Sequence, residues 1–244
     1  MKKFLAIVLS VLTLGALSFG GCDWLGEKQK NEEWKNKNIL ILGDSYSTFN
    51  GFIPNAYATW YPNLDVETVE KTWWAILAEE TESTIVQNNS WSGSPICYTG
   101  YNSADCSKSS SFIYRYRRLK ETGFFEENAV DVVFVFGGTN DSWANAPLGG
   151  MQYSNWTEQN LYGVLPAICY LTYELKTTLP NAEIVFIANT EIKSEIQQAM
   201  ALAAEYYGTK CVQLKNISKQ DGHPTAIGMR QISDQVMNYL KWLS

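Results

Sequence analysis

The chain has 244 residues, of which 45% are hydrophobic and 18% are charged, and its formal net charge is −6. This length suits one large domain rather than two, and the hydrophobic fraction is enough for a sizeable core. The negative charge disfavours a nucleic-acid partner, because a polyanion would be repelled. No internal repeat of about 20–50 residues is present, which excludes solenoid and propeller architectures.

Residues 1–21 have the three parts of an export signal. Lys2-Lys3 precedes an apolar stretch from Phe4 to Leu17, and Gly20-Gly21 supplies small residues before Cys22. The pattern resembles a bacterial lipoprotein signal, which implies that Cys22 is lipidated and becomes the new N-terminus. Ordinary cleavage without a lipid, or an uncleaved anchor, are the alternatives. We expect an exported protein that is lipid-anchored in the bacterial cell envelope, on the periplasmic or outer-surface side.

Residues 22–37 are rich in charge and contain Trp24 and Trp34. This composition suits a tether between a lipid and a folded domain. The alternative is an additional helix docked on the domain through Trp34. We expect the folded domain to span residues 38–244.

Five short runs rich in Ile, Val and Phe predict strands along this domain. They lie at residues 38–42, 84–87, 130–136, 183–188 and 210–214. Strands that are apolar throughout and alternate with helices indicate a parallel sheet covered on both faces. The sequence therefore predicts an α/β fold with a five-stranded parallel sheet.

Apolar residues at helical spacing predict helices between the strands. The patterns run over residues 69–77, 161–175, 192–203 and 229–243. Pro166 falls within the second pattern, where it either kinks the helix or belongs to its first turn.

Four cysteines remain once Cys22 is set aside. In an exported protein, the short polar loop between Cys97 and Cys106 favours a disulfide. Cys169 and Cys211 lie in apolar patterns, which favour buried free thiols. No cysteine or histidine spacing indicates a metal site, and we expect no cofactor.

Polar residues follow the predicted strands directly. Ser45 follows the first strand, residues 90–93 follow the second, residues 137–141 follow the third, and His223 follows the fifth. Ligand sites in parallel sheets form outside the carboxyl ends of the strands. We therefore expect these four loops to meet at one edge of the sheet.

These loops contain the groups that acyl transfer requires. A serine hydroxyl needs a base within hydrogen-bond reach, and His223 is the only histidine of the chain. We predict Ser45 as the nucleophile and His223 as its general base. The main-chain N–H groups of Ser45 and Gly93, with the amide of Asn140, are predicted donors to the oxyanion.

Four sequence blocks carry a family resemblance: Gly-Asp-Ser-Tyr-Ser at 43–47, Asn-Ser-Trp-Ser-Gly at 89–93, Gly-Gly-Thr-Asn-Asp at 137–141 and Asp-Gly-His-Pro at 221–224. In content and order they resemble the four blocks of the SGNH (GDSL) hydrolase family, over residues 39–243. The resemblance implies a flavodoxin-like three-layer α/β/α sandwich and hydrolysis of acyl esters without metal or cofactor. It also implies the same roles for Ser45, Gly93, Asn140 and His223.

The chain departs from the family pattern at two positions. Tyr46 stands where the family usually has Leu, a change expected to matter little because that side chain points away from the chemistry. The family usually has Asp three residues before the histidine, whereas Asp221 stands two before it and Gln220 stands three before it. We predict Asp221 as the acid that orients His223. A neutral carbonyl of Gln220, or a Ser–His dyad supported by a main-chain carbonyl, are the alternatives.

Aromatic residues gather around the motif loops and suit a sugar substrate, whose C–H faces stack on flat rings. They are Trp60, Tyr61, Trp73, Trp74, Trp91, Tyr98, Tyr101, Trp143, Tyr153 and Trp156. We predict an esterase that removes acetyl or a similar small acyl group from a glycan. A lipase, lysophospholipase or thioesterase of the same family is one alternative. A glycan-binding lipoprotein that has lost catalysis is another.

Overall fold

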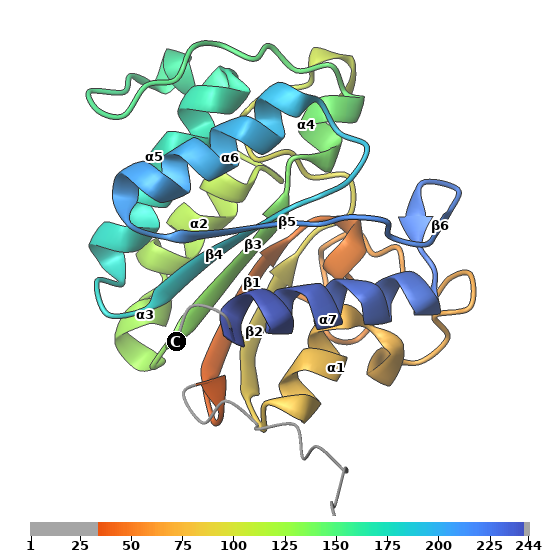
Figure 1. Ribbon diagram of the computed structural model, residues 1–244. Coiled ribbons are helices and arrows are strands. Elements are labelled where there is room, and N and C mark those ends of the chain that lie inside the picture. The colour runs from red at the N-terminus through yellow and green to blue at the C-terminus, as the bar shows by residue number, and fades with distance from the viewer. Residues whose placement is uncertain (1–33, 242–244) are drawn as a thin grey trace, which may run out of the picture. The chain divides into compact units, whose positions relative to one another are not determined.

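The computed structural model describes residues 34–241, and a five-stranded sheet lies at the centre of this part (Figure 1). The sheet has the order β2-β1-β3-β4-β5, and every neighbouring pair is parallel. The strands are β1 (Asn38–Gly43), β2 (Thr84–Ser90), β3 (Val132–Gly137), β4 (Glu183–Ala188) and β5 (Lys210–Gln213). The predicted five-stranded parallel sheet is confirmed.

Helices cover both faces of the sheet, which gives the predicted three-layer α/β/α sandwich. Figure 1 shows α2, α5 and α6 over one face and α1 and α7 over the other. The helices are α1 (Trp73–Glu80), α2 (Phe112–Glu121), α3 (Phe124–Glu127), α4 (Thr139–Trp143), α5 (Val164–Thr178), α6 (Ser194–Tyr207) and α7 (Ala226–Lys241). Short 3-10 turns are η2 (Ser45–Ser47), η3 (Val69–Lys71), η4 (Tyr101–Ser103) and η5 (Glu158–Tyr162), and a small hairpin comprises β6 (Lys219–Gln220) and β7 (His223–Pro224).

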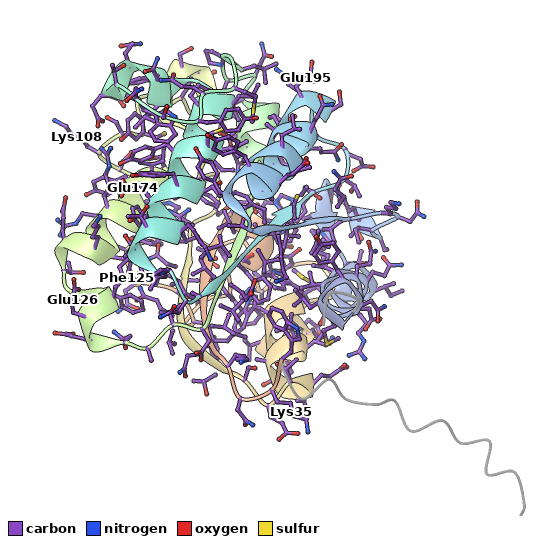
Figure 2. All side chains as sticks on the ribbon, turned by 60° about the vertical axis from the view of Figure 1, so that its left-hand side comes forward. Lys35, Lys108, Phe125, Glu126, Glu174 and Glu195 are labelled. Atoms are coloured by element: carbon purple, nitrogen blue, oxygen red, sulfur yellow. The ribbon has the colours of Figure 1, made fainter. Side chains whose placement is uncertain are left out.

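The strands are apolar throughout because successive side chains point to opposite faces and both faces are covered. Along β1, Leu40 and Leu42 enter the core beneath α2, α5 and α6, whereas Ile39 and Ile41 enter the core beneath α1 and α7. Most charged side chains lie at the surface, although Asp44, Arg115 and Asp141 are fully buried. Figure 2 shows Lys108, Glu126 and Glu195 at the surface, where each is exposed.

Helix α5 decides between the two alternatives for Pro166, and helix α2 is absent from the sequence prediction. Pro166 lies in the first turn of α5, where a backbone N–H would have no intrahelical acceptor, so the missing N–H of proline breaks no helical hydrogen bond. Helix α2 was not predicted at all, because four of its ten residues are Arg or Lys. Its inward stripe nevertheless follows helical spacing, with Phe112, Arg115, Tyr116 and Leu119 all buried.

The predicted signal (residues 1–21), Cys22 and residues 23–33 lie outside the described part of the chain. The last residues of the predicted tether contact the domain: Lys37 N–H donates to Ser83 Oγ at 3.2 Å, and Asn36 N–H donates to the Thr81 carbonyl at 3.1 Å. Within residues 34–241, no helix has both the length and the apolar character needed to cross a membrane.

The four cysteines of the described part are free thiols, so the predicted Cys97–Cys106 disulfide is wrong for this structure. The thiols of Cys97 and Cys106 instead lie against the carbonyls of Thr99 and Ala104, at 3.5 and 3.8 Å. Cys169 is buried and Cys211 is half-buried.

Candidate active site

The strand ends bring the motif loops to one edge of the sheet. In the sheet register, Gly43 at the end of β1 lies beside Ser90 of β2 and Phe136 of β3, so the loops after these strands begin at the same level. Ser45 follows β1 at once, in the 3-10 turn η2. Gly43 permits this close approach, because a Cβ atom there would lie 2.4 Å from Ser90 Oγ.

The turn η2 is held by Asp44. Its carboxylate Oδ1 accepts a hydrogen bond from Tyr46 N–H at 3.0 Å, and its own N–H donates to the Phe136 carbonyl at 3.2 Å. Asp44 is fully buried, and this burial raises the pKa of its carboxyl to about 7. Asp44 therefore supports the turn that presents Ser45.

Ser45 and His223 meet although 178 residues separate them. Ser45 Oγ lies 2.9 Å from His223 Nε2, which is hydrogen-bond distance. Both residues are buried, with 3% of Ser45 and 6% of His223 exposed. The arrangement has the geometry of a nucleophile and its base.

His223 lies at the end of a tight hairpin. Gln220 pairs with His223, and the two residues between them, Asp221 and Gly222, have φ of 50° and 74°. Two successive positive φ angles define a two-residue type I′ turn, for which Asp-Gly is a favoured pair. A side chain on Gly222 would also collide with the Trp143 ring, which a Cβ atom would meet at 2.9 Å.

The hairpin changes the predicted role of Asp221. His223 Nδ1 lies 3.1 Å from the main-chain carbonyl oxygen of Asp221, while no hydrogen bond joins the Asp221 carboxylate to the ring within the described residues. The turn leaves the Asp221 side chain exposed, and Gln220 is exposed as well. The contact is therefore the main-chain alternative of the sequence analysis, in place of the predicted carboxylate.

This carbonyl sets the tautomer of His223. A carbonyl oxygen only accepts, so Nδ1 carries the proton and donates it to Asp221 O. Nε2 is then unprotonated and can accept from the Ser45 hydroxyl. A neutral group thus orients the imidazole in the way that a general base for Ser45 would require.

Two tyrosine hydroxyls hold the chain on either side of His223. Tyr46 Oη donates to the Gly222 carbonyl, and Tyr61 Oη donates to the Pro224 carbonyl at 2.6 Å. Both tyrosines are fully buried. The expectation that the Tyr46 side chain points away from the chemistry is wrong, since its ring lies against His223 and its hydroxyl bonds to the hairpin that carries His223.

Aromatic rings surround the imidazole. The Trp60 indole stacks on it, with ring centroids 3.7 Å apart and planes 9° apart. Trp143 meets it edge-on at 5.8 Å, and Tyr46 is tilted against it at 5.4 Å. Burial lowers the pKa of His223 below its usual 6.5, an effect that the hydrogen bond to the Asp221 carbonyl opposes.

The predicted oxyanion donors lie at the same edge. The main-chain N–H groups of Ser45 and Gly93 have no acceptor among residues 34–241. Gly93 has a φ of +80° and faces open space, where a Cβ atom would meet nothing within 4 Å. Asn140 Nδ2 donates to the Ser94 carbonyl at 3.1 Å, and Asn140 Oδ1 accepts from Tyr101 Oη at 2.9 Å. The second N–H of the Asn140 amide is left without an acceptor in this part of the chain.

The hydrogen bond from Tyr101 Oη to Asn140 Oδ1 fixes which atom of the Asn140 amide faces the site. Tyr101→Phe is expected to lower kcat by about 2- to 10-fold, the cost of one neutral hydrogen bond. Steady-state kinetics check this, with Tyr173→Phe on the exposed side of α5 as the matched control. An unchanged kcat would show that the amide needs no such support.

The site also contains a cation that the sequence analysis missed. Arg115 of α2 is fully buried, and its guanidinium donates to the Asn89 carbonyl, to the Gly43 carbonyl at 3.1 Å and to Ser94 Oγ at 3.0 Å. It thereby links the ends of β1 and β2 to the loop after Gly93. Burial lowers the pKa of Arg115 to about 9.

Asp141 fastens the same loop from the other side. Its carboxylate accepts from the N–H groups of Ile96 and Cys97 at 2.8 and 3.0 Å. Burial raises the pKa of this carboxyl, while the two main-chain donors oppose the rise.

A three-layer sandwich with serine, glycine, asparagine and histidine gathered at the strand ends is the arrangement of SGNH-type ester hydrolases. Residues 37–240 match the family model of the GDSL-like Lipase/Acylhydrolase family, and the chain belongs to this family. A comparison with curated protein sequences finds no match.

Solved structures agree with this assignment. A protein classed as a GDSL-like lipase from Bacteroides ovatus is 39% identical with a TM-score of 0.79, covering 85% of this chain and 99% of its own. One from Bacteroides uniformis is 42% identical with a TM-score of 0.78, covering 84% and 96%. The acetyl xylan esterase Est2A from the rumen bacterium Butyrivibrio proteoclasticus shares the fold at 16% identity and a TM-score of 0.56, covering 86% of this chain and 64% of its own.

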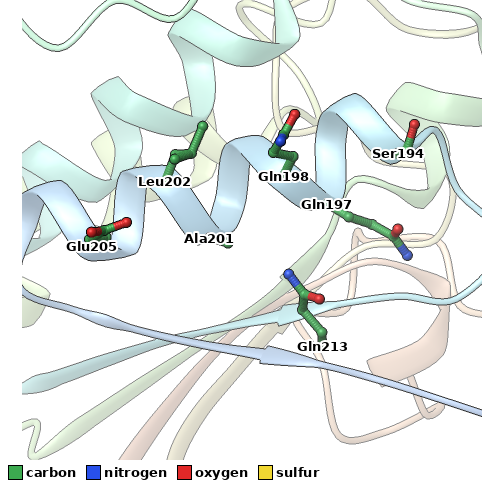
Figure 3. Close-up of a pocket in the computed structure, with 7 residues that line it drawn as sticks. All are labelled: Ser194, Gln197, Gln198, Ala201, Leu202, Glu205 and Gln213. Carbon is green, nitrogen blue, oxygen red and sulfur yellow. The ribbon is translucent and has the colours of Figure 1, made fainter.

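A separate depression of about 320 Å³ lies between α6 and β5 (Figure 3). Its lining is mainly polar: Ser194, Gln197, Gln198, Ala201, Leu202, Glu205 and Gln213. None of the predicted catalytic residues contributes to it. The depression is therefore separate from the residues gathered at the strand ends.

Proposed function

We propose that the protein hydrolyses a small acyl ester, acetyl above all, on a carbohydrate, with Ser45 and His223 as a catalytic dyad. The distance of 2.9 Å between Ser45 Oγ and His223 Nε2 carries this proposal. The Asp221 carbonyl is the partner of the other ring nitrogen. The main-chain N–H groups of Ser45 and Gly93 and the side-chain amide of Asn140 provide the hydrogen-bond donors to the oxyanion.

In the first half of the reaction, His223 Nε2 takes the proton of Ser45 while Oγ bonds to the ester carbonyl carbon. The negative charge that forms on the carbonyl oxygen is stabilised by the two main-chain N–H groups and the Asn140 amide. The C–O bond to the sugar then breaks, and the sugar oxygen takes the proton from Nε2. An acyl group remains on Ser45.

In the second half, water replaces the sugar. His223 Nε2 removes a proton from the water, whose oxygen attacks the acyl carbon. The bond to Ser45 Oγ breaks, Oγ recovers the proton, and the carboxylic acid leaves. The protein returns to its starting state without any redox step.

Exposed aromatic rings support a carbohydrate as the alcohol. Trp143 and Tyr101 are 44% and 41% exposed at the strand-end edge, and Tyr57 stacks on Trp91 with centroids 4.2 Å apart. Such faces suit the C–H surface of a sugar ring, and their phenol and indole edges suit its hydroxyls. The acetyl xylan esterase that shares the fold acts on a substrate of this class.

Release of acetate from acetylated oligosaccharides tests the proposal. The purified protein should release acetate, and the Ser45→Ala variant should not exceed the rate without enzyme. A series of p-nitrophenyl esters from acetate to octanoate should show the highest kcat/KM for the shortest chains. A preference for long chains would instead identify a lipase or thioesterase, and no release with any ester would leave a glycan-binding protein.

Replacing the acid of the sequence prediction should have little effect. Asp221→Asn keeps the main-chain carbonyl and suits the same positive φ, so kcat/KM is expected to fall by less than about 5-fold, the effect of one exposed charge. Loss of a triad carboxylate costs about 10⁴ in rate. The kinetics of Asp221→Asn on p-nitrophenyl acetate distinguish a main-chain partner of His223 from a carboxylate partner. A loss of kcat/KM above a thousandfold would show that the carboxylate takes part in catalysis.

The pH dependence should follow His223. The base must be neutral, and burial lowers the pKa of His223 below 6.5. We therefore expect kcat/KM to rise with pH, with the midpoint of the rise below pH 6.5. Asp44→Asn is the control, because Asp44 is the other buried group here whose pKa, about 7, lies near this range. The rising limb should persist in that variant, and its disappearance would assign the titration to Asp44.

We also propose that the protein is exported and anchored by a lipid on Cys22. The support is the sequence pattern of residues 1–22. Cells grown with an alkyne fatty acid should label the wild type but not Cys22→Ser. Equal labelling of both proteins would contradict the anchor.

A further inference from the structure

The stacked pair of Trp60 and His223 is not explained by the Ser45–His223 hydrogen bond. That bond lies in the imidazole plane, whereas the indole covers the face of the ring at 3.7 Å and 9°. The two other aromatic neighbours of His223 approach at 53° and 76°. Trp60 is thus the one described residue that lies flat on the base.

Trp60 also carries an unpaired polar atom. Its Nε1 is buried and has no hydrogen-bond partner within residues 34–241. Such a group costs free energy on folding, because it has lost its bonds to water. A phenylalanine would cover the imidazole without this cost. Simple packing therefore does not account for an indole at this position.

The main chain ties Trp60 to the catalytic residues. Its N–H donates to Thr48 Oγ1 at 2.9 Å, and that hydroxyl donates to the Ser45 carbonyl at 3.0 Å. The next residue, Tyr61, donates to the Pro224 carbonyl beside His223. The indole is consequently placed by the same network that places the nucleophile and the base.

Among the described residues, the groups around His223 include no carboxylate that is hydrogen-bonded to the imidazole, so another group is needed to stabilise its protonated form. Lys219 of β6 lies near the imidazole and disfavours its protonation, while the exposed Asp221 favours it. From η2, the neutral hydroxyl groups of Ser45 and Tyr46 face the hairpin. No described carboxylate accepts a hydrogen bond from the ring. When His223 takes the proton of Ser45, the positive charge of the ring therefore has only a neutral carbonyl as its hydrogen-bond partner at Nδ1.

We propose that Trp60 is a positioning residue that holds the His223 ring and stabilises its protonated form through the indole face, in place of the carboxylate of a triad. Indole is the best of the aromatic faces for a cation, and the contact is strongest where water is excluded. The inference rests on the proposed function of Ser45 and His223. It assigns to Trp60 an effect on the base and not on the substrate.

The single histidine of the chain allows a direct test. With ¹³C- and ¹⁵N-labelled histidine, the NMR titration of the imidazole has one signal to follow and needs no turnover. We expect the pKa of His223 to be highest in the wild type, lower in Trp60→Phe and lowest in Trp60→Leu. Trp156→Leu, whose ring packs on Tyr170 of α5, is the control and should leave the pKa unchanged.

If Trp60 only shielded His223 from water, its replacement would raise the pKa of His223, because the imidazolium would then be hydrated. A raised or unchanged pKa in both Trp60 variants would overturn the inference. Trp60→Phe keeps the packing and carries the test alone if Trp60→Leu does not fold. In kinetics we expect kcat/KM to fall by about 2- to 30-fold in Trp60→Leu, with a smaller loss in Trp60→Phe.

The proposed function and the role of Trp60 can be disproved independently of each other. If the wild type hydrolyses no ester and Ser45 resists acylating reagents, the proposed function is wrong whatever the pKa order. If the wild type is active but the pKa of His223 does not fall in either variant, only the role of Trp60 is wrong.

Discussion

Replacing His223 by alanine is expected to lower kcat on p-nitrophenyl acetate by about 10⁴-fold or more, because the nucleophile loses its base. The chain has no second histidine that could substitute. The loss should equal that of Ser45→Ala and of the double variant, since two residues that act as one unit are not additive. Initial rates of the three variants, corrected for spontaneous hydrolysis, measure this.

Folding controls accompany this comparison. His223 is buried, so thermal melting and circular dichroism should show that each variant retains the wild-type fold. His223→Gln is a second variant of closer shape. Activity within tenfold of the wild type in folded His223→Ala would exclude the dyad.

Replacing Arg115 by methionine is expected to lower the free energy of unfolding by about 3–5 kcal/mol. Methionine fills much of the space but leaves the carbonyls of Gly43 and Asn89 and the Ser94 hydroxyl without their buried donor. Urea unfolding followed by tryptophan fluorescence measures the change. Arg115→Lys keeps the charge but not the planar fork, so its stability should lie between those of the wild type and Arg115→Met.

Arg115 also makes a prediction for the site. Because it fastens Gly43 and Ser94, which flank the turns carrying Ser45 and Gly93, the lysine variant should lose kcat more than it changes KM. Arg118→Met, on the exposed side of the same helix, is the control for both measurements. An equal loss of stability in Arg115→Met and Arg118→Met would show that the helix, and not the buried fork, is what matters.

The sheet could be predicted because its strands are apolar on both faces, and short runs of this kind between helical patterns are typical of strands buried in a parallel sheet. The position of the site followed from the same logic, since the loops after parallel strands share one edge. His223 was singled out because the chain offers no other imidazole. The structure places it against Ser45 by contacts that no local pattern contains.

At Asp221 the structure shows a main-chain contact in place of the predicted carboxylate contact, and a local sequence signal points to it. Spacing from the histidine suggested an acid, but Asp-Gly between two short extended segments is the strongest local signal for a type I′ hairpin. In that turn the main chain, and not the carboxylate, meets Nδ1. Turn chemistry was the better guide to this residue.

Arg115, Tyr46 and Tyr61 could not be predicted in the same way. Arg115 occupies the inward stripe of a helix otherwise rich in surface charge. Its burial is tolerable because its donors pair with main-chain carbonyls, the Asn89 side chain and the Ser94 hydroxyl. The two tyrosines act through hydroxyls that reach residues more than 150 positions away. Such long-range pairings depend on the finished fold.

Covalent labelling of the wild type with a fluorophosphonate tests whether His223 activates Ser45. Such a reagent reacts with a serine only where a base activates it and donors stabilise the oxygen of the adduct. Peptide mass spectrometry should place a single adduct on Ser45, and His223→Ala should abolish it. An adduct on another residue, or labelling of Ser45 that does not depend on His223, would show that Ser45 and His223 do not form a catalytic dyad.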